Sequence, residues 1–412
     1  MNKILIGSLA IIIAALLWSL DGTFLRPKLY TLPSVMVVFI EHMLGFLVLL
    51  PFLIIHRAQI KFLNKKDWLA IFWIALFGGA LGTTFITKAF FLTGFKDISV
   101  VILLQKFQPI FAIILAAIFL RERFPKRFYL YAATAVVGGY FVTFKDPLTL
   151  ANLTTTSAMV ATFSLLAAFS WGSSTTFGKY SIKKISNGLL SALRFGLTAL
   201  IMLIPAFKYF SQFPSVSGAQ WDVFATIVIT SGAVAMFLYY FGLKKIPASV
   251  ATLCELAWPV SAIFLDYFLN NNVLSGSQLA GALLLFASVY QATSLNRSHT
   301  IVGTVQQGNK FGGELDMRTA NLDPALAKNM PKGLYICHVS LGNNYFQGLL
   351  YYGLNSLTEK DCLEVHILNF DKDIYGKNIA ITTDRYIRLP KKFTTPTELA
   401  KQLKKDLQMT ET

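Results

Sequence analysis

The residues of this chain with the clearest chemical potential lie in its last quarter, in the stretch GGELDMRTANLDP at 312–324. Gly312 and Gly313 allow a tight turn, and Thr319 and Asn321 place a hydroxyl and an amide close behind it. A glycine-rich loop of this composition could cradle a phosphate with its backbone amides. A Thr-Ala-Asn tripeptide is also found in ordinary turns, so the elements around it must decide between the two interpretations.

The composition is that of a membrane protein, at least in part. Hydrophobic residues make up 54% of the 412 residues, charged residues 14%, and the mean hydropathy is +0.55. The net charge of +16 divides into +14 for residues 1–297 and +2 for residues 298–412. Most of the cations of the first part stand in short segments between apolar runs, which indicates topology signals and excludes a nucleic-acid-binding surface. Three scattered cysteines exclude a disulfide framework or a zinc knuckle.

Ten apolar segments are long enough to span about 30 Å of hydrocarbon. They lie at 4–21, 33–55, 68–92, 98–120, 127–144, 157–178, 187–207, 222–243, 247–269 and 276–294. With the N-terminus in the cytoplasm, the inside loops carry 13 cations and the outside loops 5. The positive-inside rule therefore places both termini in the cytoplasm.

The two halves of this region are similar to each other at an offset of about 150 positions. DISVVILLQKFQPIFAIIL aligns with PASVATLCELAWPVSAIFL, which sets Gln105 over Glu255 and Pro109 over Pro259. Because each half holds an odd number of segments, the second half must be inverted in the membrane. Inverted repeats are a common device of secondary transporters.

At this point the sequence resembles the EamA-type transporters of the drug/metabolite transporter superfamily. The resemblance rests on Trp18 and Trp171, each followed by small residues at the end of an apolar segment, on ALRFGL at 192–197 and on FLRERF at 119–124. It implies ten helices and the transport of a small organic solute across the cell (inner) membrane. The segment FIEHML departs from the family by carrying Glu41 and His42.

Polar residues inside the apolar segments predict a transport cavity, because a charge at mid-bilayer costs about 2.5–3.5 kcal/mol even on the lenient insertion scale. We expect Lys88, Gln105, Arg194 and Glu255 to face this cavity, together with Trp18 and Trp171, which could stack on a flat aromatic solute. The alternatives are hydrogen bonds between helices and, for the tryptophans, interfacial anchors. The other candidates are Glu41, His42, Lys106, Gln108 and Trp258.

Beyond Leu295 the period of the pattern changes. Short alternating stretches separated by Gly, Asn and Asp turns predict a small antiparallel β domain, and TTPTELAKQLKKDL predicts one closing helix with Pro396 at its first position. The expected domains are therefore residues 1–148 and 149–296, with five membrane helices each, and a cytoplasmic domain at 297–412.

The order of motifs in this tail resembles the riboflavin kinase domain. The stretches that carry the resemblance are GTVQQGNKFGGEL from Gly303, RTANLDP from Arg318, LEVHILNFDKDIYGK from Leu363 and YIRLPKKF from Tyr386. The resemblance implies a six-stranded Greek-key barrel with a C-terminal helix, and the transfer of a phosphoryl group from ATP to riboflavin to give FMN.

The same resemblance implies roles for individual residues. Thr319 and Asn321 would bind phosphates and Mg²⁺, the turn containing Gly308, Gly312 and Gly313 would close over the nucleotide, and Glu364 would be the general base. Tyr386 and Arg388 would face the flavin. The chain departs from the family at 316–318, where Asp-Met-Arg replaces Gly-aromatic-Pro.

Three functions follow as hypotheses. The chain imports riboflavin or a flavin precursor and phosphorylates it; or the tail is a catalytically silent flavin sensor; or the transported solute is an exported metabolite unrelated to flavins. The expected partners are the solute and the lipid bilayer, without nucleic acid, and a homodimer is left open.

Overall fold

The computed structural model describes residues 3–94, 98–143, 157–270, 275–295, 299–307, 318–328, 330–342, 344–354, 360–391, 393 and 396–407. The chain divides into two compact units. One consists of Met1–Glu122 and Tyr131–Thr293 and is helical; the other consists of Arg123–Leu130 and Ser294–Thr412 and contains the sheet. Each is described by itself.

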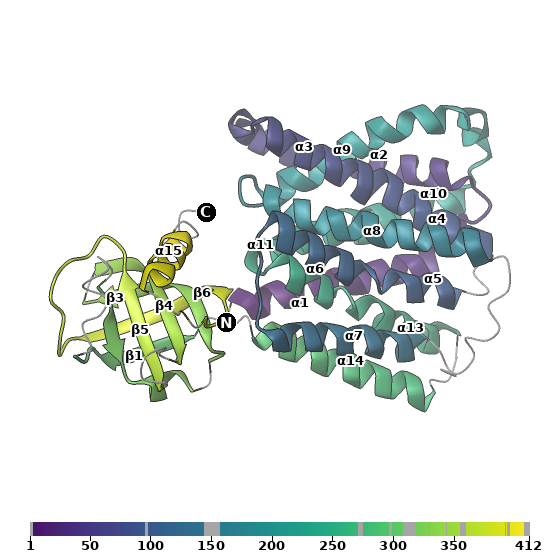
Figure 1. The fold of residues 1–412 in the computed structure, drawn as a ribbon. Helices are drawn as coiled ribbons and strands as arrows, with labels where there is room; N and C mark the ends of the chain where they lie inside the picture. Colours follow the sequence, from purple (N-terminus) through teal and green to yellow (C-terminus); the bar gives the residue numbers. More distant parts are fainter. Residues whose placement is uncertain are drawn as a thin grey trace. The chain divides into compact units, whose positions relative to one another are not determined.

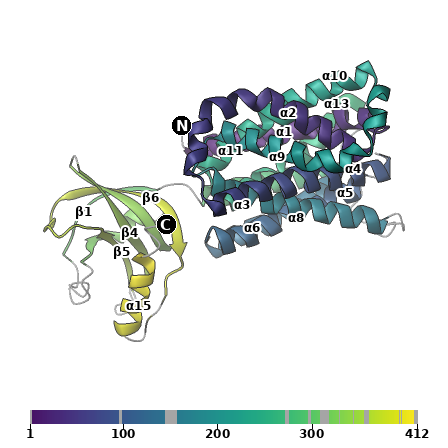
Figure 2. The same ribbon diagram turned by 90° about the horizontal axis from the view of Figure 1, so that it is seen from above.

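Long, nearly antiparallel helices build the first unit (Figures 1 and 2). Several of them run through a π-helical or 3₁₀ segment instead of ending there. In chain order the elements are α1 (Lys3–Leu20), η1 (Asp21–Leu25), η2 (Arg26–Leu29), α2 (Ser34–His56), η3 (Arg57–Phe62), α3 (Lys65–Trp73), η4 (Ile74–Leu81), α4 (Gly82–Thr93), α5 (Ile98–Gln105), α6 (Gln108–Phe119), α7 (Lys126–Thr143), α8 (Ser157–Ser181), α9 (Asn187–Phe207), η6 (Phe210–Ser215), α10 (Gly218–Ile227), η7 (Val228–Val234), α11 (Ala235–Lys245), α12 (Ala248–Cys254), α13 (Ala257–Asn270) and α14 (Gly276–Ser294).

Two helices are broken at related positions. The break between α5 and α6 falls at residues 106–107, and the break between α12 and α13 at residues 255–256. The prolines explain both, since a proline ring clashes with the carbonyl four residues before it. For Pro109 that carbonyl belongs to Gln105, and for Pro259 it belongs to Glu255. The helical hydrogen-bond pattern is therefore interrupted beside two polar side chains, those of Gln105 and Glu255.

Glycines allow the helices of this unit to approach closely. A Cβ at Gly138 of α7 would lie 2.9 Å from the carbonyl oxygen of Gly281 in α14, and one at Gly242 of α11 would lie 2.5 Å from that of Gly7 in α1. Small residues at helix contacts are typical of membrane bundles, in which helices associate by close backbone packing.

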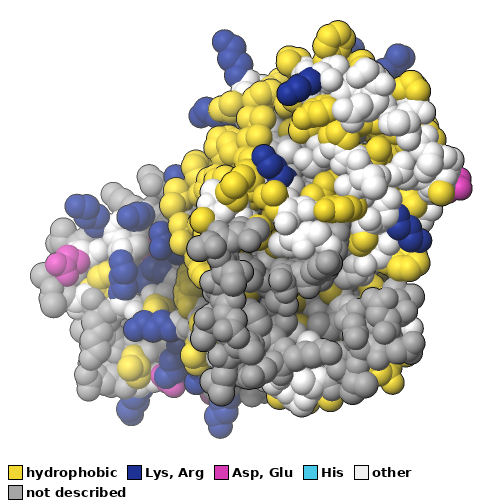
Figure 3. All heavy atoms as spheres, turned by 90° about the vertical axis from the view of Figure 1, so that its right-hand side faces the viewer, with side chains coloured by type: hydrophobic (Ala, Val, Ile, Leu, Met, Phe, Trp, Pro, Cys, Tyr) yellow, Lys and Arg dark blue, Asp and Glu magenta, His cyan; other side chains and the backbone are white. Residues whose placement is uncertain are grey.

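The surface of the helical unit is strongly apolar. Ile204 is 81% exposed, Leu283 73% and Phe207 72%, and hydrophobic side chains are widespread over the part of this surface seen in Figure 3. Within the described residues, six helical stretches are long and apolar enough to cross a membrane: Lys3–Leu29, Ser34–Phe62, Lys65–Thr93, Val101–Phe119, Asn187–Phe207 and Gly218–Lys245. The count of ten membrane helices stays a prediction.

The second unit is a six-stranded antiparallel sheet with a helix beside it (Figures 1 and 2). Its strands are β1 (Thr300–Thr304), β2 (Ala320–Leu322), β3 (Gly333–Leu341), β4 (Asn344–Leu354), β5 (Asp361–Ile367) and β6 (Asn378–Arg388), followed by α15 (Pro396–Leu407); a 3₁₀ turn, η9 (Pro324–Ala327), follows β2. The strand order is β1-β6-β3-β4-β5-β2. Because β6 returns to lie beside β3, the four strands β3 to β6 form a Greek key.

The sheet curls until its edge strands meet. The amide of Gln306, just after β1, donates to the carbonyl of Asn321 in β2 over 2.8 Å. The concave face holds one core, which includes Ile301, Tyr335, Val365 and Ile381. The sequence-based prediction of an antiparallel β domain with a closing helix is confirmed, and β2 is a strand that the sequence pattern did not reveal.

A second, smaller cluster lies on the other face of the sheet. Leu334, Ile336, Leu349 and Ile387 are buried there, with Tyr351 and Leu407 packed against them. Since Leu407 is the last residue of α15, this helix covers part of the outer face.

Candidate functional sites

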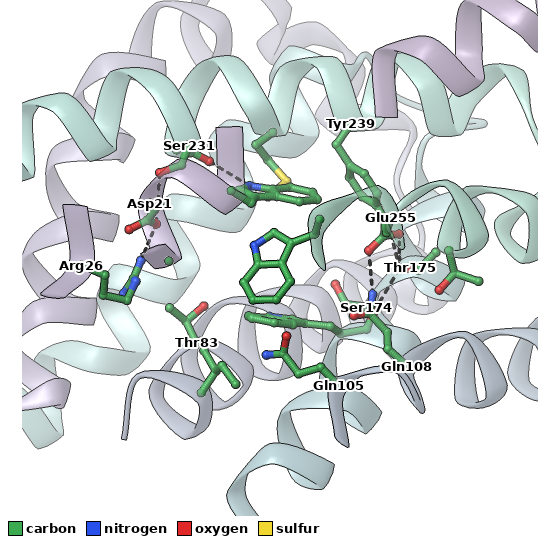
Figure 4. A pocket seen from close by; sticks show the side chains of 18 of the residues that line it. Asp21, Arg26, Thr83, Gln105, Gln108, Ser174, Thr175, Ser231, Tyr239 and Glu255 are labelled. Atoms are coloured by element: carbon green, nitrogen blue, oxygen red, sulfur yellow. Dashed lines mark hydrogen bonds and ion pairs between the residues drawn. The ribbon is translucent and has the colours of Figure 1, made fainter. Parts of the chain in front are cut away.

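The helical unit contains a cavity at the level of the helix breaks and the π-helical segments (Figure 4). It offers about 170 Å³ to the centres of water-sized molecules, whereas one buried water needs about 10–15 Å³ on the same measure. The cavity is therefore large enough for an organic molecule. Two polar groups lie apart along it in Figure 4, with indole rings drawn between them.

The first polar group is centred on Arg26. Its guanidinium lies 2.7 Å from Asp21 Oδ2 and 3.1 Å from Glu41 Oε2, and it donates to Thr87 Oγ1 over 3.0 Å. All three charged side chains are at least nine-tenths buried. The π-helical turn η1 carries Asp21, while Ser231 in η7 donates to its carboxylate over 3.1 Å. This group ties η1, η2, α2, α4 and η7 together.

The second polar group is centred on Glu255, at the break between α12 and α13. Its carboxylate accepts from Gln108 Nε2 over 2.6 Å and from Thr175 Oγ1 over 3.5 Å. Thr175 also bonds to the Tyr239 hydroxyl over 2.7 Å. Arg194 lines the same cavity and donates to the carbonyl oxygen of Gly78 over 2.7 Å.

Tryptophans supply the flat walls of the cavity. Trp18 donates its Nε1–H to the carbonyl of Ser231 over 3.0 Å, and Trp171 donates to the carbonyl of Gly78 over 3.1 Å. Both acceptors lie in π-helical segments. Trp258 lies beside the break at Glu255, with the Lys106 ammonium 5.5 Å from its ring centre. Fixed indoles of this kind suit a flat aromatic solute.

Most of the cavity residues predicted from the sequence are brought together by the fold. Trp18, Gln105, Trp171, Arg194 and Glu255 all line the cavity. The prediction for Lys88 is wrong: its side chain is exposed and lies over the ring of Phe163 at 4.6 Å. Helical periodicity showed that Lys88 falls within an apolar segment but not which face it occupies.

Sequence reasoning also missed the role of Arg26, which is one of the five cations that the predicted topology assigns to the outside loops. The structure buries it between two carboxylates. The available signal was the presence of Asp21 and Glu41 within apolar segments on either side of it in the sequence.

In the second unit, the predicted site residues fall into one row across the sheet. Strand pairing sets Arg388 of β6 opposite Leu334, Leu334 opposite Tyr351, Tyr351 opposite Glu364, and Glu364 opposite Asn321 of β2. Directly opposed residues of antiparallel strands share a face, with Cβ atoms about 4.5–5.5 Å apart. Thr319, two residues before Asn321, follows on the same edge.

Glu364 is the central acidic group of this row. It lies between Asn321 and Tyr351, with the Cys362 thiol as a hydrogen-bonding neighbour. Burial raises the pKa of the Glu364 carboxyl above its usual range. A carboxylate of raised pKa is a stronger proton acceptor, which is the property that a general base needs.

Arg388 and Tyr386 differ in their placement. Arg388 lies at the other end of the row and forms an ion pair with Asp406 of α15, with Nη2 and Oδ2 2.6 Å apart. Tyr386 points into the concave core, edge-on to Tyr335 at 5.1 Å. The row therefore includes Arg388 but not Tyr386. Gly308, Gly312 and Gly313 lie outside the described residues.

Thr319 and Asn321 offer oxygen ligands of the kind that Mg²⁺ prefers. Within the described residues, no three His, Cys, Asp or Glu side chains converge as a metal cluster. A magnesium ion here would consequently have to arrive with charged ligands of its own. Nucleotide phosphates supply such ligands, so the donor set fits a nucleotide-bound Mg²⁺.

Comparison with known proteins assigns a family to each of the two parts of the chain. The EamA-like transporter family model matches residues 5–144 and 158–293. The chain belongs to the EamA-like transporter family. It is 41% identical over 294 residues to the riboflavin transporter ImpX of Fusobacterium nucleatum, which covers 70% of this chain and 98% of that protein. A solved crystal structure with 16% sequence identity covers 70% of this chain and 96% of its own with a TM-score of 0.57, a likeness of fold. With its apolar helices, this EamA-like chain is an integral membrane protein.

The remainder of this EamA-like chain, residues 295–412, matches the flavokinase family model, described as riboflavin kinase. The RNA-binding riboflavin kinase RibR of Bacillus subtilis is 32% identical over 111 residues, and the bifunctional riboflavin kinase/FMN adenylyltransferase of Haemophilus influenzae is 32% identical over 119. The chain spans 47% and 38% of these two proteins. These matches support riboflavin kinase activity for the C-terminal unit.

Proposed function

We propose that this protein imports riboflavin and converts it to FMN with its own C-terminal domain. The observation that carries the proposal is the presence in one chain of a helical unit 41% identical to a riboflavin transporter and of a riboflavin kinase domain with a carboxylate of raised pKa on its outer face. Riboflavin is neutral, whereas a phosphomonoester carries about −1.5 to −2 charges near pH 7 and does not recross the bilayer. Phosphorylation therefore retains the imported flavin.

For the membrane part, we propose ten helices in two inverted repeats of five. The two proline-linked breaks, about 150 residues apart, support this arrangement, as do the π-helical segments η4 and η7, which interrupt helices at equivalent places. We also propose that both termini lie on the cytoplasmic side of the inner membrane, where the kinase domain has access to ATP.

The cavity suits the two parts of riboflavin. Its indoles match the flat ring system, and its polar groups match the hydroxylated chain. Among the described residues, Asp21 Oδ1, Arg194 Nε and Thr252 Oγ1 are buried without a hydrogen-bond partner, and all three residues line the cavity. Buried polar atoms without partners are rare, so these atoms are available to a hydroxylated solute.

In the kinase domain, we propose that Glu364 accepts the proton of the ribityl hydroxyl that attacks the γ-phosphate. Thr319 and Asn321 hold the phosphates, and Mg²⁺ bound with the nucleotide offsets their charge. On the resemblance to the riboflavin kinase domain, Gly308, Gly312 and Gly313 are assigned to nucleotide binding. Arg388 orients the flavin from the far end of the row while remaining paired with Asp406.

The proposal is tested with the full-length protein in liposomes loaded with ATP and Mg²⁺. Riboflavin supplied outside should accumulate inside as FMN. Glu364→Gln should stop FMN formation and leave riboflavin counterflow in place, while Asp384→Asn, which alters an exposed carboxylate of β6, should affect neither.

Two results would favour the two alternative hypotheses, a solute unrelated to flavins and a catalytically silent flavin sensor. Absence of riboflavin counterflow in the wild type would mean that the transported solute is unrelated to flavins. Flavin binding without FMN formation would make the tail a sensor.

A further inference from the structure

The three carboxylates that line the cavity differ in their partners. Asp21 and Glu41 share the guanidinium of Arg26, at 2.7 and 3.1 Å. Glu255 accepts from neutral groups, the amide of Gln108 and the hydroxyls of Thr175 and Tyr239. Among the described residues, no lysine, arginine or histidine nitrogen lies within ion-pair distance of Glu255. Glu255 is thus the one cavity carboxylate of the described chain that has no cation within ion-pair distance.

The other ionisable groups around Glu255 have partners of their own or lie farther away. The Arg194 guanidinium of α9 is held by the carbonyl of Gly78, the Tyr240 hydroxyl and the Met236 sulfur. The Lys106 ammonium stands over Trp258. The remaining ionisable groups are Tyr239 on α11, which hydrogen-bonds to Glu255 itself, Cys254 at the end of α12, and Asp21, Arg26, Glu41 and His42 in the rest of the cavity lining.

The hydrogen bonds of Glu255 suit both of its charge states. An amide such as Gln108 offers N–H to a carboxylate and C=O to a carboxylic acid, and a hydroxyl such as Thr175 can donate or accept. Exchanging the proton therefore requires reorientation of these two groups and no loss of contact. Asp21 and Glu41 have no such freedom, because protonation of either would weaken the ion pair that it makes with Arg26.

The location of Glu255 links its charge to the state of the cavity. It stands where Pro259 interrupts the helix, beside a break that matches the one at residues 106–107. An ionised carboxylate without a cationic partner is tolerated while water fills the cavity and is disfavoured once a solute displaces that water. Closing the cavity around a neutral solute consequently favours uptake of a proton, and opening it to the cytoplasm favours release.

We propose that Glu255 is the proton-binding site that couples solute uptake to proton movement, one proton accompanying each neutral solute. This inference rests on the proposed function of the helical unit as a flavin importer. The proton binds a carboxylate oxygen from the outer side, the resulting acid is neutral during the crossing, and the proton leaves to the cytoplasm.

The test uses the full-length protein in liposomes, with riboflavin as solute. An inward gradient of one pH unit should give accumulation of riboflavin up to about tenfold over the outside concentration, because one pH unit is equivalent to a tenfold concentration ratio. A pH-sensitive dye trapped inside should report acidification that requires external riboflavin. Counterflow of labelled riboflavin, measured at equal pH on both sides, reports transport without a gradient.

Variants separate coupling from folding. Glu255→Gln should reduce the ratio of uptake with and without the gradient to about one and abolish riboflavin-dependent acidification, while Glu255→Asp should restore part of both. Asp222→Asn, which removes an exposed carboxylate on α10, should leave the ratio at its wild-type value. If Glu255→Gln does not fold, as judged by size-exclusion chromatography, the Asp variant and the wild-type dye signal still decide.

The outcomes are distinguishable. Wild-type counterflow without any effect of the gradient would overturn the coupling and leave the proposed function standing. Gradient-driven accumulation that survives in Glu255→Gln would overturn the assignment to this residue. Absence of wild-type counterflow would overturn the proposed function, and the coupling with it.

Discussion

The ion pair between Arg388 and Asp406 is expected to hold α15 on the sheet, and Asp406→Asn should release it. The Asp406 side chain is 1% exposed and accepts from Arg388 through both Nε and Nη2, at 3.0 and 2.6 Å. Removing one partner of a buried ion pair costs about 3–5 kcal/mol. Because Arg388 is 15% exposed and also donates to the carbonyl of Leu389, we expect the lower end, about 3 kcal/mol, or roughly 150-fold in the docking equilibrium.

Hydrogen exchange of the full-length protein, followed by mass spectrometry, measures this quantity directly. The protection factors of the α15 amides should fall about 100-fold in Asp406→Asn, because about 3 kcal/mol corresponds to about two powers of ten in an equilibrium constant. Asp384→Asn, at an exposed position of β6, should change protection by no more than the equivalent of about 0.5 kcal/mol. Protection of α15 within threefold of wild type in Asp406→Asn would refute the reasoning. The double variant Arg388→Met with Asp406→Leu should recover most of the loss, since apolar replacement of a buried pair is often neutral.

Further predictions concern both sites. Glu364→Gln should lower kcat for riboflavin phosphorylation by about 10²–10⁴-fold, the usual contribution of a general base. Because burial raises the pKa of Glu364 and the base must be ionised, wild-type kcat/KM should decline on acidification well before the ordinary glutamate pKa of about 4.3; a profile flat down to that pH would contradict the assignment. The raised pKa of Glu364 also means that folding favours the neutral carboxyl. This contribution to the free energy of unfolding is present below the unfolded-state pKa and is lost as the pH rises through the folded-state pKa. Glu364→Gln should therefore raise the free energy of unfolding at about pH 8 but not at about pH 4, as measured by urea denaturation. Behind the cavity-lining residue Ser174, Gly78→Ala would place a Cβ in steric conflict with Ser174 Oγ and should reduce riboflavin counterflow by about tenfold or more, whereas Gly218→Ala, with nothing within 4 Å of its Cβ, should not.

The helical unit shows which features the sequence can predict. Apolar length identified the helical stretches. The segments 98–120 and 247–269 were expected to be continuous, whereas the structure breaks each of them shortly before its proline, Pro109 or Pro259, because proline acts on the backbone that precedes it. The burial of Arg26 could not be predicted in the same way, since it depends on carboxylates that come from η1 and α2. The face of α4 on which Lys88 lies depends on how α4 packs against other helices, and the sequence of this segment alone does not show that packing.

The β unit shows the same division. Alternation predicted the antiparallel β domain, but it did not reveal β2, which has only three residues, too few to display a period of two. The motifs predicted that Asn321, Glu364 and Arg388 act together. Their alignment in one row depends on the register of four strand pairs, which includes shifts between β3 and β6, and register is a property of the assembled sheet.

The brevity of β2 has a consequence for how this kinase domain can vary. The face on which Asn321 stands is decided by three backbone pairings with β5 and one bridge to Gln306. A residue inserted within β2 would turn the Asn321 side chain into the core, whereas one inserted before β2 shifts no pairing. Positions 316–318, at which this chain departs from the family, precede β2 in the sequence. Changes there do not alter the pairing of β2 with β5. The sequence that precedes β2 can therefore vary while backbone hydrogen bonds keep Asn321 in its position.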